Sequence, residues 1–324
     1  MTVFRFARCI ALAAALAAAS GSAALAQYPD RPIRLVTPFP PGGAVDVVTR
    51  LVADKMAAEL GKPLIIEAKA GAGGILATDT VAKADKDGYT LLITTPNHTI
   101  NAALNPKLPY DTEKDLAPIS IFAGVPEVLV AHPSVPFTDF KSFVAYAKAN
   151  PGKLNYSSAG IGTLPHITME LLLQQTGVKV THVPYRGAAP AMTDLLAGVV
   201  QLKLDTYATS YQNVEAGRLK DLAYAGRKRS PLLPNVPTVA EMGVANYEGI
   251  LWIGLMAPAG TPQPVIDRLA AAVTKAVKTP DLLERFRKDD IEAIGTTPAE
   301  FAKQIASEIP EWKKVIQTAG IKSE

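Results

Sequence analysis

The chain reads Pro-Phe-Pro-Pro-Gly-Gly-Ala-Val-Asp-Val-Val-Thr-Arg over residues 38–50, and this stretch decides the fold. The apolar run Ile33–Thr37 before it is typical of a buried strand. After it, apolar residues recur every four positions, which predicts a helix over Val45–Leu60 with one buried face. Residues 40–43, Pro-Pro-Gly-Gly, are therefore the turn from a strand into a helix.

The start of this predicted helix is suited to an anion. The first N–H groups of a helix have no partner within it, and the helix dipole adds partial positive charge there. Gly42 and Gly43 let a ligand approach the backbone closely. A tight turn with nothing bound could have the same sequence, so the turn alone does not decide the function.

The first 26 residues have the pattern of a secretory signal peptide. Arg5 and Arg8 supply its positive region, Ile10–Ala19 its short apolar region, and Ala24-Leu25-Ala26 a small-residue cleavage site. We therefore expect cleavage after Ala26 and export to the periplasm.

The composition narrows the function classes. The only cysteine, Cys9, lies in the predicted signal, so we expect neither disulfides nor a cysteine metal site. Beyond the signal, 31 Lys and Arg face 30 Asp and Glu, and no basic run is long enough for nucleic acid. The four histidines lack metal-ligand spacing, and Leu76 interrupts the loose resemblance of Gly71–Gly74 to a dinucleotide fingerprint. The sequence thus predicts no metal and no cofactor.

Strands and helices alternate along the remaining chain, which predicts an α/β fold with mostly parallel sheets. The strand candidates are Ile33–Thr37, Leu64–Glu67, Thr90–Thr94, Ile119–Phe122, Val128–Ala131, Leu154–Ser157, Val180–Val183, Gln201–Leu204, Leu222–Ala225 and Ile253–Ala257. The helix candidates are Val45–Leu60, Ile75–Ala84, Thr138–Ala149, His166–Thr176, Ala189–Ala197 and Pro264–Lys278. Further helices are expected to begin at Pro280 and Pro298.

About ten strands are too many for one small sheet, so we expect two α/β lobes. The chain would cross between them near Gly124–Glu127 and again near Tyr247–Leu251. Lobe one then comprises residues 27–125 and 250–324, and lobe two comprises residues 126–249. Two crossings form a hinge and place a cleft between the lobes.

Ligands of open α/β sheets bind beyond the carboxyl ends of the strands, and the loops at these positions give a consistent set of candidates. Helix starts rich in Gly, Ser and Thr occur among them in both predicted lobes. The loops are Phe39–Asp46, Ala70–Gly74, Thr94–His98, Ser157–Thr163 with His166, Pro184–Gly187 and Asp205–Tyr207.

Motifs along the whole chain resemble those of the Bug-type periplasmic solute-binding proteins of the tripartite tricarboxylate transporter class. The match runs in order from Tyr28 to the C-terminal helices. The matching motifs are Tyr28–Ile33, Pro38–Gly43 with Asp46 and Arg50, Gly71–Gly74, Asp87–Leu92, Ser157–Thr163 with His166, Val183–Gly187, Leu233–Thr238 and Ala257–Pro262. The chain departs from the usual pattern at Ala68, at Arg186 and at Pro96-Asn97.

The resemblance implies a type II periplasmic binding fold that closes around a small organic carboxylate, such as a di- or tricarboxylate or an aromatic acid. It implies that the loop at Phe39–Asp46 meets one end of the ligand, that Ser158–Thr163 holds a carboxylate, and that Asp205 faces the cleft. It also implies membrane transporter subunits as partners, and we expect a monomer. With the loop positions, the predicted ligand-binding residues are Phe39, Gly42, Gly43, Ala44, Asp46, Thr95, Asn97, Ser158, Gly160, Gly162, Thr163, His166, Arg186 and Asp205.

Other roles remain open for single residues. Asp46 can stabilise the helix start, His166 can be a hydrogen-bonded structural histidine, and Asp205 can cap the next turn. A secreted serine hydrolase using Ser158, His166 and Asp205 is the alternative function. It is disfavoured because no G-x-S-x-G motif is present and the order Ser, His, Asp is unusual. The leading hypothesis is a receptor without enzymatic activity.

Overall fold

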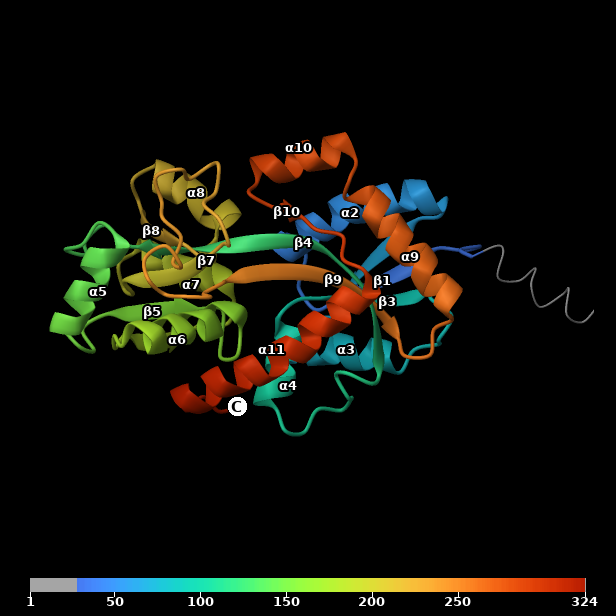
Figure 1. The fold of residues 1–324 in the computed structure, drawn as a ribbon, viewed down its shortest axis with the longest axis horizontal. Coiled ribbons are helices and arrows are strands. Elements are labelled where there is room, and N and C mark those ends of the chain that lie inside the picture. Colours follow the sequence, from blue (N-terminus) through green and yellow to red (C-terminus); the bar gives the residue numbers. More distant parts are fainter. Residues whose placement is uncertain (1–27, 324) are drawn as a thin grey trace, which may run out of the picture.

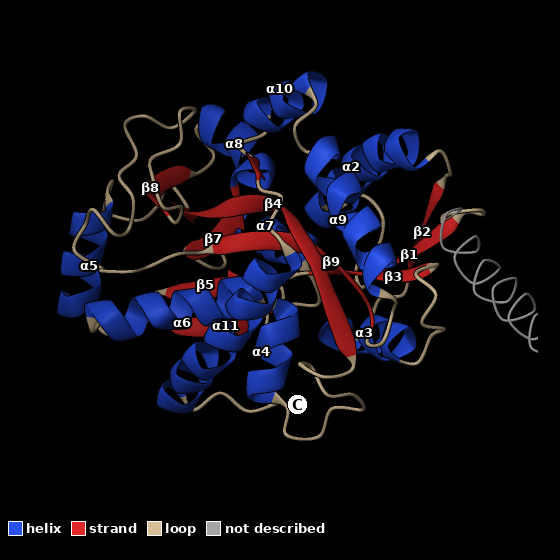
Figure 2. Cartoon of the chain, turned by 45° about the vertical axis from the view of Figure 1, so that its right-hand side comes forward, coloured by secondary structure: helices blue, strands red, loops and turns tan. Residues whose placement is uncertain are grey.

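The structure is a computed structural model that describes residues 28–323, so the predicted signal and its cleavage site lie outside the described residues. The described chain forms two α/β lobes, which lie on the right and left of Figure 1. Hydrogen bonds link the strands in the order β2-β1-β3-β9-β4-β7-β5-β6, and β8 and β10 also pair with β4. Figure 2 shows these strands between flanking helices.

The first lobe is built on the parallel strands β2, β1 and β3. Its N-terminal elements are β1 (Ile33–Thr37), α2 (Ala44–Leu60), β2 (Leu64–Ala68), η1 (Ala72–Gly74), α3 (Ile75–Ala82), β3 (Thr90–Thr94) and α4 (Asn97–Leu104). Leu35 and Leu91 pack toward α2, whereas Val36 and Leu92 pack toward α3. Because helices cover both faces of the sheet, both faces of β1 and β3 carry buried apolar residues, although Arg34 of β1 is exposed. Both strands have the predicted bounds.

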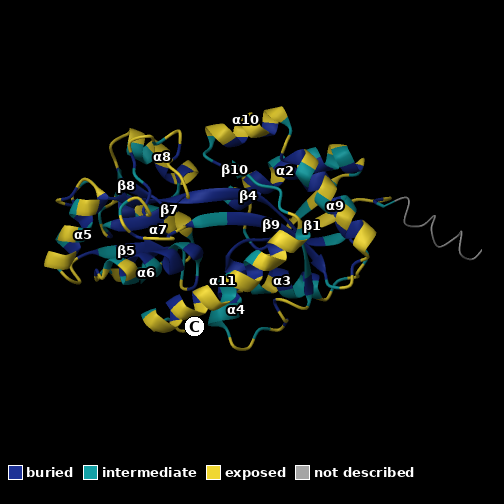
Figure 3. Ribbon diagram, in the orientation of Figure 1, coloured by how far each residue is buried: buried dark blue, intermediate teal, exposed yellow. Residues whose placement is uncertain are grey.

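The second lobe repeats this plan with the parallel strands β6, β5 and β7. Its elements are α5 (Phe140–Ala149), β5 (Asn155–Ser158), α6 (Leu164–Thr176), β6 (Thr181–Pro184), α7 (Ala188–Leu196), β7 (Leu202–Thr206), α8 (Tyr207–Glu215) and β8 (Lys220–Tyr224). Helices α5 and α6 share one apolar core with the strands, and α7 and α8 share another. Figure 3 shows the strands buried and the outer helix faces exposed in both lobes.

One long strand joins the lobes. Strand β4 (Leu116–Ala131) has 16 residues and pairs antiparallel with β9 (Ile250–Pro258) in the first lobe and with β7 and β8 in the second. The prediction of two separate strands, Ile119–Phe122 and Val128–Ala131, is therefore wrong. Pro126 does not break the strand, because its nitrogen points away from β9 and lies between the stretch paired with β10 and the stretch paired with β7.

The C-terminal elements return to the first lobe and then cover the junction. They are α9 (Gln263–Ala276), α10 (Pro280–Lys288), β10 (Glu292–Ala293) and α11 (Pro298–Ala319). The predicted helix starts at Pro280 and Pro298 are confirmed. The sequence analysis did not predict α4 or α8.

Helix α11 packs on both lobes, as Figure 1 shows, because it contacts α4 of the first and α6 of the second. Trp312 lies in an apolar cluster with Ile100 of α4 and with Leu164 and Ile167 of α6. Its ring Nε1–H donates to Thr99 Oγ1 at 3.2 Å. Trp312 thus ties α11 to both lobes.

Truncating Trp312 should destabilise the protein strongly. Trp312→Ala removes a 7% exposed side chain and leaves a cavity, so we expect a loss of about 3–5 kcal/mol in the free energy of unfolding in urea. The neighbouring exposed Lys313→Ala should change it by less than about 0.5 kcal/mol. A Trp312→Ala variant as stable as the Lys313→Ala variant would contradict the bridging role of α11.

Candidate functional site

The loop between β1 and α2 has the tight shape that its glycines predict. Gly42 has φ of +90°, which favours glycine, and its N–H donates to Asp46 Oδ2 at 3.0 Å. Asp46 Oδ1 also lies 2.9 Å from Nη2 of Arg50. The hydrogen bond from Arg50 holds the pKa of Asp46 below its usual range. Asp46 therefore closes its own loop, and a direct ligand contact by it stays a prediction.

The same loop leaves backbone donors accessible. Among the residues that the structure describes, no hydrogen bond uses the N–H of Gly43 or Ala44. Gly43 is the N-cap of α2 with φ of −80°, and no atom lies within 4 Å of the position that a Cβ would take. Two unpaired N–H groups thus lie at the positive end of the α2 dipole, and there is free space at the Cβ position of Gly43.

The second-lobe loop after β5 is a turn that presents Ile161. The Thr163 N–H donates to Gly160 O at 3.3 Å, and Gly162 has φ of +73°, as position three of a type II turn requires. The Gly160 N–H donates to Ser158 Oγ at 3.1 Å, and the Gly162 N–H donates to His166 Nδ1 at 3.1 Å. Within residues 28–323, the N–H groups of Ile161 and Leu164 have no such partner. The donors left for a ligand are therefore those of Ile161 and Leu164, while Gly160, Gly162 and Thr163 shape the turn.

Three stacked aromatic rings lie beside this loop and are linked to it by hydrogen bonds. His166 and His182 stack with ring centroids 3.9 Å apart, and Tyr156 stacks on His182 at 4.8 Å. His182 Nε2 lies 2.7 Å from Ser158 Oγ, and Tyr156 OH donates to Glu170 Oε1 at 2.6 Å. Burial lowers the pKa of His166 to about 3 and that of His182 to about 4, so both rings are neutral. Neutral His166 is what allows Nδ1 to accept the Gly162 N–H.

Asp205 lies at the end of β7, as expected, but its carboxylate is already paired. Its Oδ1 lies 2.7 Å from Nζ of Lys203, and both side chains are almost fully buried. Nearby Glu127 of β4 accepts a hydrogen bond from Thr168 at 2.8 Å, and burial raises its pKa to about 7. Contact of Asp205 with a ligand stays a prediction.

Unpartnered hydroxyls gather at the carboxyl edge of the first sheet. By strand register, Thr37 and Thr95 face the same side as Leu35 and Ile93, toward α2, which carries Thr49. Each of the three threonines is 1% exposed, and within residues 28–323 none of their hydroxyls has a hydrogen-bond partner. Buried hydroxyls need partners, so this region has capacity for water or for a ligand.

Of the other predicted residues, Asn97 is buried at the start of α4, and half-buried Phe39 packs on the first-lobe core. Arg186 is exposed, and no ion pair of Arg186 occurs within the described residues. The hydroxyl of the neighbouring Tyr185 donates to Asp194 Oδ2 of α7 at 2.6 Å.

Loops from both lobes meet along helix α4. Asn101 Nδ2 donates to Gly73 O at 2.9 Å, which fixes the loop after β2. One turn on, Leu104 Cδ2 lies 2.7 Å from the position that a Cβ on Gly162 would take. Positions three apart lie on the same side of a helix, so both glycine-rich loops border one face of α4.

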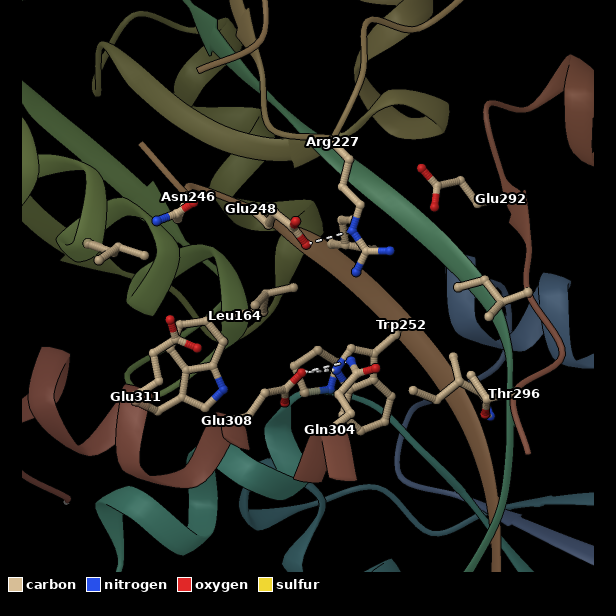
Figure 4. Close-up of a pocket in the computed structure, with 16 residues that line it drawn as sticks. Leu164, Arg227, Asn246, Glu248, Trp252, Glu292, Thr296, Gln304, Glu308 and Glu311 are labelled. Carbon is tan, nitrogen blue, oxygen red and sulfur yellow. Dashed lines mark hydrogen bonds and ion pairs between the residues drawn. The ribbon is translucent and has the colours of Figure 1, made fainter. Parts of the chain in front are cut away.

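A separate cavity of about 330 Å³ lies between the lobes beside α11 (Figure 4). Trp252, Glu308 and Gln304 form part of its wall, and Arg227 donates to Glu248 at 2.9 Å across it. None of the predicted ligand-binding residues lines it, although Pro96 and Leu164 adjoin them in sequence. Glu308 already accepts hydrogen bonds from Trp252, Gln304 and Thr99.

The sequence analysis missed three residues close to the site, of which Glu127 and Lys203 are buried and His182 is half-buried. His182 lies one residue before the quoted motif Val183–Gly187, and its pairing with Ser158 depends on the parallel register of β5 and β6. Lys203 could have been noticed, because Leu202-Lys203-Leu204-Asp205 alternates apolar and charged residues and so places Lys203 and Asp205 on one strand face.

The alternative of a serine hydrolase loses its geometric basis. Ser158 Oγ bonds to His182 rather than His166, whose Nδ1 is occupied by the Gly162 N–H, and Asp205 pairs with Lys203. The relay that this alternative requires, from nucleophile to base to carboxylate, is therefore not formed by these three side chains.

Within residues 28–323, no three His, Cys, Asp or Glu side chains come together as metal ligands would. Over the same residues, the helices lack the combination of length and apolar character that crossing a bilayer requires.

Comparisons with known proteins identify the family and the fold. The model of the tripartite tricarboxylate transporter family receptor matches residues 48–321. Protein BugT of Bordetella pertussis is 35% identical, with 91% of each chain covered. The structure of Rpa4515 from R. palustris with adipate is 35% identical with a TM-score of 0.83, covering 91% of this chain and 99% of that one.

MatC from Rhodopseudomonas palustris, with bound malate, is 34% identical with a TM-score of 0.77, covering 89% of this chain and all of that one. These likenesses confirm the predicted two-lobed periplasmic binding fold. The chain belongs to the receptor family of the tripartite tricarboxylate transporters and is of the Bug type.

Proposed function

We propose that this protein is a periplasmic receptor that captures a small organic carboxylate between its lobes and delivers it to a tripartite membrane transporter. It carries out no reaction on the ligand. Residues 27–125 with 250–324 form one moving unit and residues 126–249 the other. The proposal includes cleavage of the signal after Ala26.

The proposal rests mainly on the unpaired backbone N–H groups of the two lobes. Each lobe offers unpaired N–H groups at a helix start, those of Gly43 and Ala44 in the first and those of Ile161 and Leu164 in the second. A carboxylate accepts such bonds while gaining from the helix dipole. A protein of nearly balanced charge can hold an anion in this way without a buried cation.

The relatives support the ligand class. Two structures with 34–35% identity to this chain contain adipate and malate, which are both small carboxylates. Binding and release would be coupled to rotation about β4 and the start of β9, since Val125 and Pro126 pair there with Leu251 and Ile250.

Filling the space at Gly43 should weaken binding. Gly43 has an ordinary φ and free space around it, so Gly43→Val introduces a side chain without strain and shields the α2 donors. We expect affinity for the best acid of a thermal-shift screen to fall at least about tenfold, or about 1.4 kcal/mol, in calorimetric titration.

The control for this variant is Ala58→Val, an exposed change in the last turn of the same helix, which should bind like the wild type. Arg186→Gln tests the competing explanation of a simple ion pair. If Gly43→Val binds normally and Arg186→Gln abolishes binding, the helix-start mechanism is wrong. Gly162→Val is less informative, because φ of +73° and the nearness of Leu104 would strain the loop.

The neutral histidines predict an acid-sensitive structure. The pKa values of His166, about 3, and His182, about 4, lie below the usual value near 6.5 for an unfolded chain. The unfolded state therefore binds more protons, so this contribution to stability is complete above about pH 6.5 and is lost as the pH falls through about 4 to 3.

Urea unfolding between pH 7.5 and 4 measures this effect. We expect the stability of the wild type to fall more steeply with acid than that of His182→Gln, which has one titrating ring fewer. Equal slopes for the two proteins would show that His182 is not held neutral by the fold.

A further inference from the structure

The rim of the proposed cleft carries exposed apolar side chains. Leu76 is 49% exposed in the first turn of α3, and Ile161 is 36% exposed at the corner of the second-lobe turn. Scattered exposed apolar residues are normal on protein surfaces. Leu76 and Ile161 each lie at the carboxyl edge of a sheet where a loop opens a helix.

The structure presents Ile161 outward by a specific device. The positive φ values of Gly160 and Gly162, +136° and +73°, place Ile161 between two bends. Thr163 fixes the turn, because its hydroxyl donates to Gly160 O at 2.7 Å. The side chain of Ile161 and its unpaired N–H thus belong to the same exposed corner.

Leu76 is accommodated by the glycine run before α3. A Cβ on Gly71 would lie only 2.8 Å from Leu76 Cδ1, so glycine at this position makes room for the leucine to lie over the loop. The start of α3 in turn abuts the loop after β1, since a Cβ on Gly74 would lie 3.2 Å from Pro38 Cβ. Leu76 is therefore adjacent to the loop that carries the α2 donors.

The loops next to these two side chains border the same face of α4 from opposite lobes. The Gly73 carbonyl is held by Asn101, and Gly162 lies against Leu104, one turn further along the helix. Leu76 is three residues after Gly73, and Ile161 is the residue before Gly162. An object in the cleft at this edge would contact apolar surface from both lobes beside the N–H donors.

We propose that the ligand is a carboxylic acid whose remaining body is hydrocarbon, and that Leu76 and Ile161 cover this body when the lobes close. The inference rests on the proposed function and adds the class of acid. The helix starts hold the carboxylate. Burial of the hydrocarbon against Leu76 and Ile161 makes acids without hydroxyl groups bind more tightly than their hydroxylated counterparts. Hydroxyl groups on the part of the body that Leu76 and Ile161 cover would be buried against carbon atoms.

Matched pairs of acids that differ only in hydroxyl groups test the proposal. Calorimetric titration would compare succinate with malate, glutarate with 2-hydroxyglutarate, and cyclohexanecarboxylate with quinate. In each pair with measurable binding, the unhydroxylated acid should bind at least about tenfold tighter, which is about 1.4 kcal/mol. Equal or tighter binding of the hydroxylated acids would overturn the inference and leave the proposed function intact.

Two variants test whether Leu76 and Ile161 cause the preference for acids without hydroxyl groups. Leu76→Ser and Ile161→Ser should each reduce the preference within a pair several-fold, whereas Leu283→Ser, at a 43% exposed position on α10, should leave it unchanged. Equal weakening of both members of a pair would also overturn the inference. If no carboxylate binds or raises the melting temperature, the proposed function itself fails and the inference falls with it.

Discussion

The arrangement of the two lobes depends on the continuity of strand β4. Its 16 residues pair with β9 in the first lobe and with β7 and β8 in the second, so one strand belongs to the sheets of both. Because the lobes share this strand, the carboxyl edges of their parallel strands lie along one cleft. Helix α11 reinforces the arrangement through Trp312, which packs on α4 and α6 at once. We therefore propose that the loops that end β1 and β5 are parts of a single site.

In that proposed site, some backbone N–H groups donate within the loops, and the others remain available to a ligand. Asp46 takes the Gly42 N–H, Ser158 takes that of Gly160, and His166 takes that of Gly162. These bonds fix the loops and leave the next donors along the chain for a ligand. The nearby charges are cancelled, because Arg50 pairs with Asp46, Lys203 with Asp205, and both histidines are neutral. Under the proposed function, helix dipoles rather than net charge would select the anion.

Much of the fold could be predicted from local patterns. Strands β1 and β3 are short apolar runs bounded by turns, and Pro280 and Pro298 open helices because proline fits a first helical position. The prediction of a break in β4 was wrong because the effect of Pro126 depends on which strand its nitrogen faces, which only the assembled sheet determines. Helix α4 was missed because the polar start of Asn97–Leu104 resembles a loop.

The candidate site, like the fold, could be predicted from the sequence only in part. Its glycine-rich loops could be found, since a helix start after a strand has a sequence signature. The bond between Ser158 and His182 could not, because it joins side chains 24 residues apart through the register of β5 and β6. The ion pair of Lys203 with Asp205 was visible as an alternating strand pattern, but its burial depends on the helices that cover it.

The most direct test is a titration of ¹⁵N-labelled protein with succinate, malate and cyclohexanecarboxylate, followed through its backbone amide resonances. If helix starts in both lobes hold the carboxylate, the largest changes at saturation will be those of Gly43, Ala44, Ile161 and Leu164. Changes confined to residues lining the 330 Å³ cavity, such as Arg227 and Trp252, with the loop amides unmoved, would contradict the account.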